Sequence, residues 1–413
     1  MIKFYSFCYL LFSPVILFKG LSRKEGLKVF ERFGLYINRK KMLRPSVWVH
    51  AVSVGELIAV IPLIQKISIN GERVVVTTGT ITGYEACKNH LGNTVEHAFF
   101  PIDLTIFIKK FVRQFRPKKI LLSESELWPN LLFFCKKNNI RINLVNGRLS
   151  ERSFGFYSKY SKIFKSLFFS VDKVICQNQL YANRFLKLGF RESAIFISGN
   201  LKIDVKPTHS FDEVLEKKLT KCFFKKKIIV LGSTHSKEDS LIIEAMQEIK
   251  NRFDDLFIVH VPRYVQNAKR IKKKYAIRGL KLVTLGHFSS DMVYDGLIVD
   301  KLGVLNYFYS KADIAFVGGS LEERGCHNVI EPAYFGVPVI VGPFIENFEY
   351  EIRLMKQSGI LSIVKTAKDF SNRVSDVLEK KGQSKELEVK VEKFFQSEQG
   401  GLRKTLKILG YPV

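Results

Sequence analysis

Continuous apolar runs alternate with segments of helical spacing along most of the chain. Apolar runs of this kind, each followed by a helical pattern, indicate parallel strands that helices cover on both faces. In the first half of the chain we expect strands at residues 47–54, 73–80, 118–124, 141–147 and 173–178. This series ends at SGNLKID, and the polar segment after it, with Pro207, indicates a linker.

The same alternation then begins again. A second series of strands is expected at residues 227–234, 255–263, 279–286, 296–300, 312–320 and 336–342. Two successive α/β series of similar length predict two doubly wound lobes facing each other across a cleft. We place the first lobe at residues 21–206 and the second at residues 207–413, and the last helices could cross back to the first lobe.

The N-terminal residues form a separate apolar segment. Residues 1–18 (MIKFYSFCYLLFSPVILF) contain only Lys3, Ser6, Ser13 and Pro14 as interruptions, and several basic residues follow them. The run is just long enough to cross a bilayer and has no cleavage site, so an uncleaved membrane anchor is expected at residues 1–20. The basic flank would leave the rest of the chain in the cytoplasm. The alternative is a helix that lies on the membrane or is buried.

The net charge of the chain indicates which kind of molecule it binds. There are 66 Lys and Arg against 39 Asp and Glu, which gives a net charge of +27 and predicts an anionic partner. A phosphorylated substrate or an acidic membrane surface fits. Nucleic acid is not expected, because the basic clusters lack interleaved aromatic residues. Neither GxGxxG nor GxxxxGK[ST] occurs, which argues against dinucleotide oxidoreductases and P-loop NTPases.

The first candidate for chemistry is a carboxylate, Glu56, in the sequence HAVSVGE. It follows a predicted strand, and ligands of open α/β sheets bind beyond the carboxyl ends of strands. Gly55 permits a tight turn, Ser53 can cap the next helix, and the helix dipole would favour ionised Glu56. Glu56 either stabilises only the helix or also accepts a proton from a substrate hydroxyl.

A second acidic group stands at the end of another predicted strand. Glu124 and Glu126 lie in SESELWPN, where Trp128 could stack on a sugar or pack into the core. Lys202, in SGNLKID, could meet a developing negative charge, although a solvated lysine is the commoner outcome.

The glycine-rich segment GGSLEERGCHNVIEPAYFGVPVIVGP, residues 318–343, is the strongest signal of the second lobe. It predicts a turn after a strand and then a helix that begins near His327 and Asn328. Free backbone N–H groups at such a helix bind phosphate. Glu331, one turn along, could hold a ribose diol, so the segment predicts a nucleotide-sugar site.

Two other strand ends offer contacts to a nucleotide. Arg263 follows Pro262 at the first, and residues 302–304 lie at the second. No metal is expected, because the adjacent pair Cys326 and His327 cannot easily face one ion, no further ligand is suitably spaced, and the chain has no Asp-x-Asp pair. No other cofactor is expected.

Together these motifs resemble the Kdo (3-deoxy-D-manno-octulosonic acid) transferases of Gram-negative lipopolysaccharide assembly. The matching pieces run in order from about residue 47 to residue 351: HAVSVGE, TTGTITGYE, ESELWPN, NGRLSERSF, SGNLKID, GSTHSKED, VPR, FVGGSLEERGCHN, EPAYFGVPVIVGP and ENFE.

The resemblance implies a GT-B glycosyltransferase at the inner membrane, with its lobes in the cytoplasm, that moves Kdo from CMP-Kdo to a lipid A precursor. It implies that Glu56 is the general base of an inverting displacement and that Glu126 and Lys202 support the transition state. The residues it implies for CMP binding are Pro262, Arg263, Leu302, Gly303, Val304, Asn328, Val329, Ile330 and Glu331.

The chain departs from the family where a second glycine usually precedes the His-Asn pair and Cys326 stands instead. Because glycine reaches backbone conformations that cysteine avoids, we expect a retained but slightly reshaped CMP site. Two alternatives stay open: another GT-B enzyme, such as a lipid A disaccharide synthase or a sugar-nucleotide epimerase, and a membrane-tethered basic binding protein. The sequence does not indicate the number of Kdo units, the acyl pattern of the acceptor or the oligomeric state.

Overall fold

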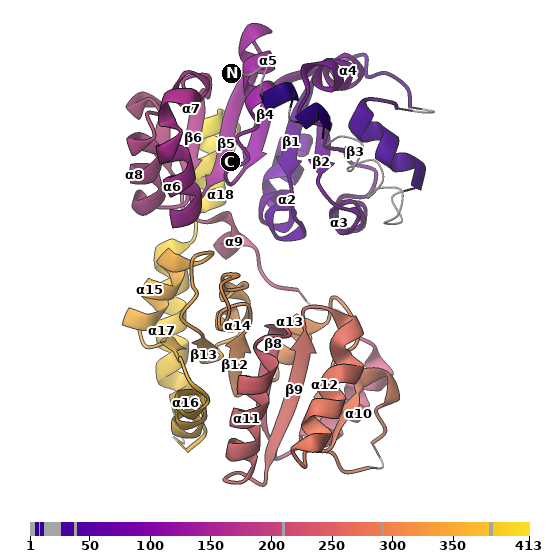
Figure 1. Cartoon of the computed structure of the whole chain (residues 1–413), viewed down its shortest axis with the longest axis vertical. Coiled ribbons are helices and arrows are strands. Elements are labelled where there is room, and N and C mark those ends of the chain that lie inside the picture. Colours follow the sequence, from indigo (N-terminus) through magenta and orange to yellow (C-terminus); the bar gives the residue numbers. More distant parts are fainter. Residues whose placement is uncertain are drawn as a thin grey trace. The chain divides into compact units, whose positions relative to one another are not determined.

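The computed structural model describes residues 5–7, 9–11, 26–36, 39–208, 211–290, 292–379 and 383–413. Its contacts divide the chain into two compact units. The first holds the residues up to Val205 together with Glu398–Val413, and the second is Lys206–Ser397. Each unit is a parallel sheet between helices (Figure 1).

The sheet of the first unit has seven strands in the order β3-β2-β1-β4-β5-β6-β7. The strands are β1 (Ser46–Ala51), β2 (Arg73–Thr78), β3 (Glu96–Phe99), β4 (Pro117–Ser123), β5 (Arg141–Gly147), β6 (Lys173–Cys176) and β7 (Ile195–Ile197). The helices are η1 (Gly26–Phe33), α2 (Val54–Ile69), α3 (Ile81–Leu91), α4 (Thr105–Phe115), α5 (Pro129–Lys137), α6 (Glu151–Lys159), α7 (Ser161–Phe168), α8 (Gln179–Lys187), η2 (Glu192–Ala194), α9 (Leu201–Asp204) and α18 (Gly401–Leu409).

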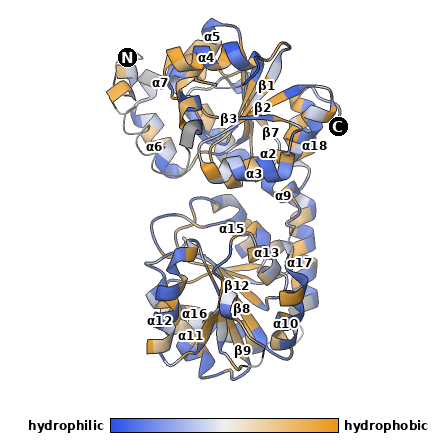
Figure 2. Ribbon diagram, turned by 90° about the vertical axis from the view of Figure 1, so that its right-hand side faces the viewer, coloured by the Kyte–Doolittle hydropathy of each residue, from blue (hydrophilic) through white to orange (hydrophobic). Residues whose placement is uncertain are grey.

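Alternation along β1 shows why both faces of this sheet are covered. Trp48 packs into one apolar cluster with residues of α4, α5, α7 and α8. Val47 and Val49 point the other way, into a cluster with residues of α2 and α18. Since side chains of a strand alternate between faces, an uninterrupted apolar run requires helices on both sides. Figure 2 shows hydrophobic residues along the strands of each unit.

The second sheet has the order β10-β11-β9-β8-β12-β13-β14. Its strands are β8 (Lys227–Thr234), β9 (Leu256–Pro262), β10 (Leu282–Thr284), β11 (Gly296–Ile298), β12 (Ile314–Val317), β13 (Val339–Val341) and β14 (Leu361–Ile363). The helices are α10 (Glu213–Phe223), α11 (Asp239–Lys250), η3 (Val265–Asn267), α12 (Ala268–Ile277), η4 (Leu285–His287), α13 (Leu305–Tyr309), α14 (Ile330–Tyr334), α15 (Glu349–Gln357), α16 (Ala367–Glu379) and α17 (Gln383–Glu398), and α17 ends at the boundary between the units.

The structure confirms two doubly wound parallel sheets and every predicted strand, and it adds β3, β7 and β14. These three strands are edges of their sheets. They are three or four residues long and only partly buried. An edge strand has one strand neighbour and needs less apolar surface, so its sequence lacks the long apolar run by which the central strands were predicted.

The C-terminal helix α18 belongs to the first unit, where it packs on α9 and α2. Asp204, at the end of α9, accepts hydrogen bonds from the backbone N–H groups of Gly400 (2.6 Å) and Leu402 (2.5 Å). A carboxylate at the start of a helix satisfies donors that have no partner within the helix. Asp204 therefore fastens the returning chain to the first unit.

The predicted anchor at residues 1–20 lies largely outside the described residues, of which only 5–7 and 9–11 fall within it. Within the described part of the chain, no helix has both the length and the apolar character needed to cross a membrane.

Candidate active site

The strand order of each sheet reverses at one place, between β1 and β4 in the first unit and between β8 and β12 in the second. Ligands of doubly wound folds bind at this switch point, beyond the carboxyl ends of the strands. Glu56 follows β1 and Glu124 follows β4, so the first switch point holds two of the carboxylates that the sequence singled out.

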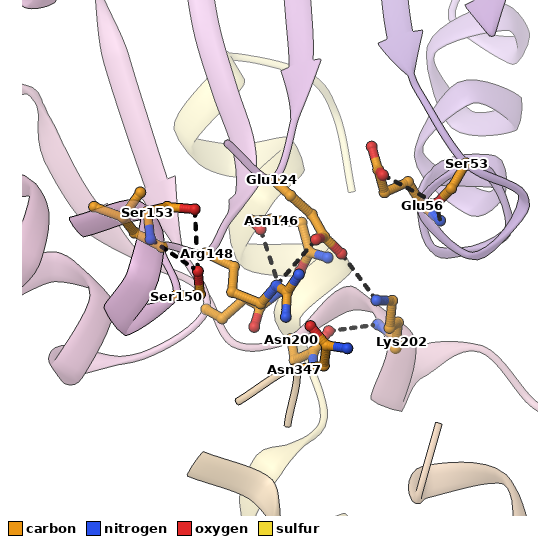
Figure 3. Close-up of polar contacts among 12 residues, drawn as sticks. Ser53, Glu56, Glu124, Asn146, Arg148, Ser150, Ser153, Asn200, Lys202 and Asn347 are labelled. Atoms are coloured by element: carbon orange, nitrogen blue, oxygen red, sulfur yellow. Dashed lines mark hydrogen bonds and ion pairs between the residues drawn. The ribbon is translucent and has the colours of Figure 1, made fainter. Parts of the chain in front are cut away.

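Glu56 lies in the first turn of α2, as predicted, and Ser53 is the N-cap. The Ser53 hydroxyl accepts a hydrogen bond from the Glu56 backbone N–H (3.3 Å) and donates one to Glu56 Oε1 (3.0 Å). Glu56 Oε2 accepts from the backbone N–H of Val52 (3.0 Å). This is a form of capping box, so Glu56 does stabilise its helix, and both carboxylate oxygens are held in place (Figure 3).

Two sequence expectations about this turn were wrong. Gly55 does not form a tight turn. It lies inside α2 without a positive φ, and a Cβ there would meet nothing within 4 Å. The helix dipole also does not keep Glu56 fully ionised at neutral pH. Burial, followed by the nearby charge of Glu124, raises the pKa of Glu56 to about 7, and its hydrogen bonds only partly offset this.

Glu124 is the centre of a buried ion-pair network (Figure 3). Its Oε1 lies 2.8 Å from Lys202 Nζ, and its Oε2 lies 3.0 Å from Arg148 Nε. The residue is 6% exposed and has a φ of 56°, a conformation uncommon for a non-glycine residue. Burial opposes the charge of Glu124, but Lys202 and Arg148 outweigh it and lower the pKa to about 2. Glu124 is therefore a permanent anion.

Glu126, two residues further on, is in the opposite state. Burial raises its pKa to about 8, and the charges of Glu56 and Glu124 add to this. At neutral pH Glu126 is mostly a neutral carboxylic acid, which can donate a hydrogen bond. Lys202 thus pairs with Glu124 and not with Glu126. The sequence did not indicate this pairing.

An apolar pocket of about 210 Å³ lies beside the turn before α2, where it is lined by Val52, the residue whose backbone N–H donates to Glu56. Trp128 and Phe100 line the same pocket and pack on each other with ring centroids 5.2 Å apart. Trp128 thus packs against the core, which is one of the two roles considered for it, and it also lines a pocket. Its stacking on a sugar stays a prediction. Arg32, another lining residue, donates a hydrogen bond to the carbonyl of Gly79 (2.9 Å).

Some of the residues predicted to contact a nucleotide lie near the second switch point. Arg263 follows β9 and its backbone N–H donates to the carbonyl of Thr234, at the end of β8 (3.0 Å). His235 comes next in the chain, and its Nε2 lies 2.8 Å from Nε2 of His327. The residues after β8, β9 and β12 thus meet at one edge of the sheet.

The helix expected near His327 begins later and is short. Its first residue is Ile330, and it ends at Tyr334. The Asn328 side chain bridges the turn before it, accepting from the Ile330 backbone N–H (3.1 Å) and donating to Glu331 Oε1 (3.0 Å). The helix ends before Gly336, whose φ of 72° is the left-handed conformation that commonly terminates helices.

Residues 302–304 form the turn before α13, whose N-cap is Val304. Gly303 has a φ of 81° and Leu302 is exposed, whereas Val304 is buried. α13 contacts α14, which carries Glu331, so this turn belongs to the same end of the second unit.

Cys326 needs no unusual backbone. It is 1% exposed and is absent from the residues with positive φ, whereas the neighbouring Gly325 has a φ of 90°. The strained position of this loop is therefore occupied by glycine, and the Cys326 side chain packs inward. Among the described residues no group of three or more His, Cys, Asp and Glu side chains could hold a metal ion.

Sequence reasoning missed the roles of two residues. Arg148 lies in the quoted motif NGRLSERSF and His235 in GSTHSKED, so both stood inside recognised segments. Arg148 pairs with Glu124, 24 residues away, and His235 with His327, 92 residues away. No pattern in the neighbouring sequence of either residue indicates such a distant contact.

Comparison with known proteins gives consistent results. Residues 28–205 match the family model described as 3-deoxy-D-manno-octulosonic-acid transferase (kdotransferase). The chain is 29% identical to the 3-deoxy-D-manno-octulosonic acid transferase of Haemophilus influenzae, over 98% of this chain and 97% of that protein. It is 32% identical to the enzyme of the same name from Chlamydia muridarum, over 85% of this chain and 83% of that protein.

Similar solved structures support the fold. A glycosyltransferase from Rickettsia africae has a TM-score of 0.61 at 14% identity, covering 89% of this chain and 98% of its own. A putative UDP-N-acetylglucosamine 2-epimerase from Listeria monocytogenes has a TM-score of 0.61 at 15% identity, covering 89% of this chain and 96% of its own. The fold of two doubly wound sheets agrees with these sequence relatives, and the chain belongs to the Kdo transferase family.

Proposed function

We propose that this protein transfers Kdo from CMP-Kdo to a lipid A precursor, lipid IVA, with inversion at the anomeric carbon of Kdo. The observation that carries the proposal is Glu56, held by two of its neighbours at a switch point and with its pKa raised to about 7. A general base works best when its pKa lies near the operating pH. Family membership supplies the sugar and the type of reaction.

In the proposed step a hydroxyl oxygen of the acceptor attacks the anomeric carbon while Glu56 removes the hydroxyl proton. The bond from that carbon to the phosphate oxygen breaks, and CMP leaves with the electron pair. Neutral Glu126 can donate a hydrogen bond, and Lys202 supplies positive charge where negative charge develops. The Glu124 carboxylate positions Lys202. The pocket lined by Trp128 is proposed to take an apolar or sugar part of the acceptor.

The donor is proposed to bind in the second unit. Pro262, Arg263, the turn at residues 302–304 and residues 328–331 would contact CMP. Arg263 can bind the phosphate through its guanidinium. The carboxylate of Glu331, which is held by Asn328, can accept from the ribose hydroxyls. No metal or other cofactor enters the proposed step.

The reaction is tested by mass spectrometry of a phosphorylated tetraacyl lipid A precursor after incubation with the protein and CMP-Kdo. We expect additions of Kdo to the lipid, and the number of additions gives the number of units transferred. Lipid IVA that stays unmodified in the presence of folded protein would contradict the proposed acceptor. Lipid A precursors with other acyl patterns, run in parallel, separate a wrong acceptor from an inactive enzyme.

The protein is proposed to work at the cytoplasmic face of the inner membrane. The apolar start of the sequence and the net charge of +27 support this, since basic surface is attracted to anionic lipid. In flotation experiments we expect the full-length protein to rise with vesicles that contain anionic lipid. Recovery of the protein at the bottom of the gradient would contradict a membrane location.

A further inference from the structure

Two histidines face each other at the switch point of the second sheet. His235 directly follows β8, and His327 lies in the loop after β12, the neighbouring strand. Their Nε2 atoms are 2.8 Å apart, and the rings are nearly parallel, at 8°. At this distance one nitrogen must carry a proton and the other must accept it. The pair is hydrogen-bonded ring to ring.

The pair is a fixed part of the fold, because Glu238 fastens the two loops together. This carboxylate is 1% exposed and accepts hydrogen bonds from three backbone N–H groups. The donors are His235 (2.8 Å), Gly319 (2.9 Å) and Leu321 (2.9 Å). One donor belongs to the loop after β8 and two belong to the loop after β12.

The two ends of the pair differ. His235 Nδ1 lies 3.7 Å from Glu322 Oε1, which also pairs with Arg324 Nε at 2.9 Å. A carboxylate beside Nδ1 favours a proton on that nitrogen. His235 Nε2 then accepts, and His327 Nε2 donates. In the neutral pair this leaves a lone pair on Nδ1 of His327, for which no hydrogen bond is found among the described residues.

The surroundings of the pair are positively charged. Burial lowers the pKa of both histidines, and Arg263 and Arg324 add to this effect. Together with the neighbouring His235 ring, these causes lower the pKa of His327 to about 4. Glu322 acts in the opposite direction on His235. Tyr264 packs edge-on against His235, at 5.7 Å between ring centroids. Two arginines beside two neutral histidines form a setting that an anion would stabilise.

We propose that Glu322, His235 and His327 form a proton relay that takes up one proton from solvent when the donor phosphate binds beside His327. This rests on the proposed function, which places CMP at Arg263 and residues 328–331. With an anion at each end, both outer Nδ1 atoms carry a proton and a third proton lies between the rings. Three protons on four nitrogens is one more than the neutral pair holds, so the bound pair is cationic between two anions.

The consequence is that donor binding strengthens as the pH falls. One proton taken up on binding changes the dissociation constant by up to about tenfold per pH unit. The dissociation constant depends on pH in this way over the pH range in which the histidine pair is neutral in the free protein and positively charged in the complex.

The test is isothermal titration calorimetry with the methyl ester of CMP, whose phosphate carries a single, constant charge like that of the donor. Binding is measured between about pH 5 and about pH 8, a range in which the free pair is neutral and a histidine that gains an anionic partner can take up its proton. Buffers of different ionisation enthalpy are used. His235→Gln keeps a hydrogen-bonding group near the position of Nε2 but cannot take up a proton. His90→Gln, an exposed histidine of α3 in the first unit, is the matched control.

We expect wild type and His90→Gln to bind more tightly at lower pH with uptake of up to one proton, and His235→Gln to bind with no uptake. Glu322→Gln is a second variant, to be used if His235→Gln does not fold. We expect its dissociation constant to depend less steeply on pH than that of wild type. Wild-type binding without proton uptake, or unchanged uptake in both variants, would overturn the relay alone. Absence of binding to folded wild type would overturn the donor site as well, and the Kdo-transfer assay then shows whether the proposed function also fails.

Discussion

Replacement of Glu56 by glutamine is expected to lower the rate of Kdo transfer by about 10²- to 10⁴-fold, the usual contribution of a general base. Glutamine keeps an oxygen that can accept from the backbone N–H of Val52, so the turn before α2 should stay folded. The amide cannot remove a proton from the acceptor hydroxyl. The rate constant for transfer from CMP-Kdo, measured with donor and acceptor at saturation, checks this.

The pH dependence of the transfer rate is an independent test of Glu56 as the base. Burial and Glu124 raise the pKa of Glu56 to about 7, so the base form is the minor one below that pH. Transfer by wild type should therefore increase as the pH rises through about 7, and this rise should vanish in Glu56→Gln. Glu85→Gln, an exposed glutamate of α3, is the control and should keep the wild-type profile. Equal rates for wild type and Glu56→Gln would exclude Glu56 as the base.

Replacement of Glu124 by glutamine is expected to destabilise the first unit by on the order of 3 kcal/mol, because it leaves two paired cations without their buried anion. Lys202 and Arg148 both lose an ionic partner. For a unit of this size the melting temperature should fall by roughly 6–12 °C. Differential scanning calorimetry measures it. Transfer activity should also fall, since Lys202 is no longer held.

The contribution of Glu124 to stability also has a defined pH range. The pKa of Glu124 is lowered to about 2 in the folded protein. The ionised carboxylate therefore contributes its full stabilisation at pH values above the ordinary pKa of a glutamate, which is that of the unfolded chain. This stabilisation is lost as the pH falls from there to about 2.

The matched control for Glu124→Gln is Glu72→Gln in the same unit, whose pair with Lys118 (2.9 Å) lies at a half-exposed lysine. Pairs of this kind contribute about 0–1 kcal/mol. If the two variants melted at the same temperature, the buried network would not have the proposed role.

The sequence predicted the elements whose pattern is local. The apolar runs identified the central strands of both sheets because these strands are buried on both faces. Ser53 was predicted as a helix cap from its place before an apolar helix, and the structure confirms it. The order of the motifs along the chain predicted the family, which the sequence relatives confirm.

The tertiary structure alone decided the protonation of the carboxylates and the partners of the charged groups. Glu56, Glu124 and Glu126 lie within 70 positions of one another, yet their pKa values are about 7, 2 and 8. The difference depends on which cation the folded chain brings to which carboxylate, and Lys202 is 78 residues from Glu124.

The pairing of His235 with His327 likewise arises because β8 and β12 are neighbours in the sheet although far apart in the chain. Apolar periodicity is a property of each segment by itself, and so the sequence determined the strands, the caps and the class of the fold. Burial and charge pairing depend on the order in which strands associate, and so only the folded chain decided which acid is charged and which groups act together.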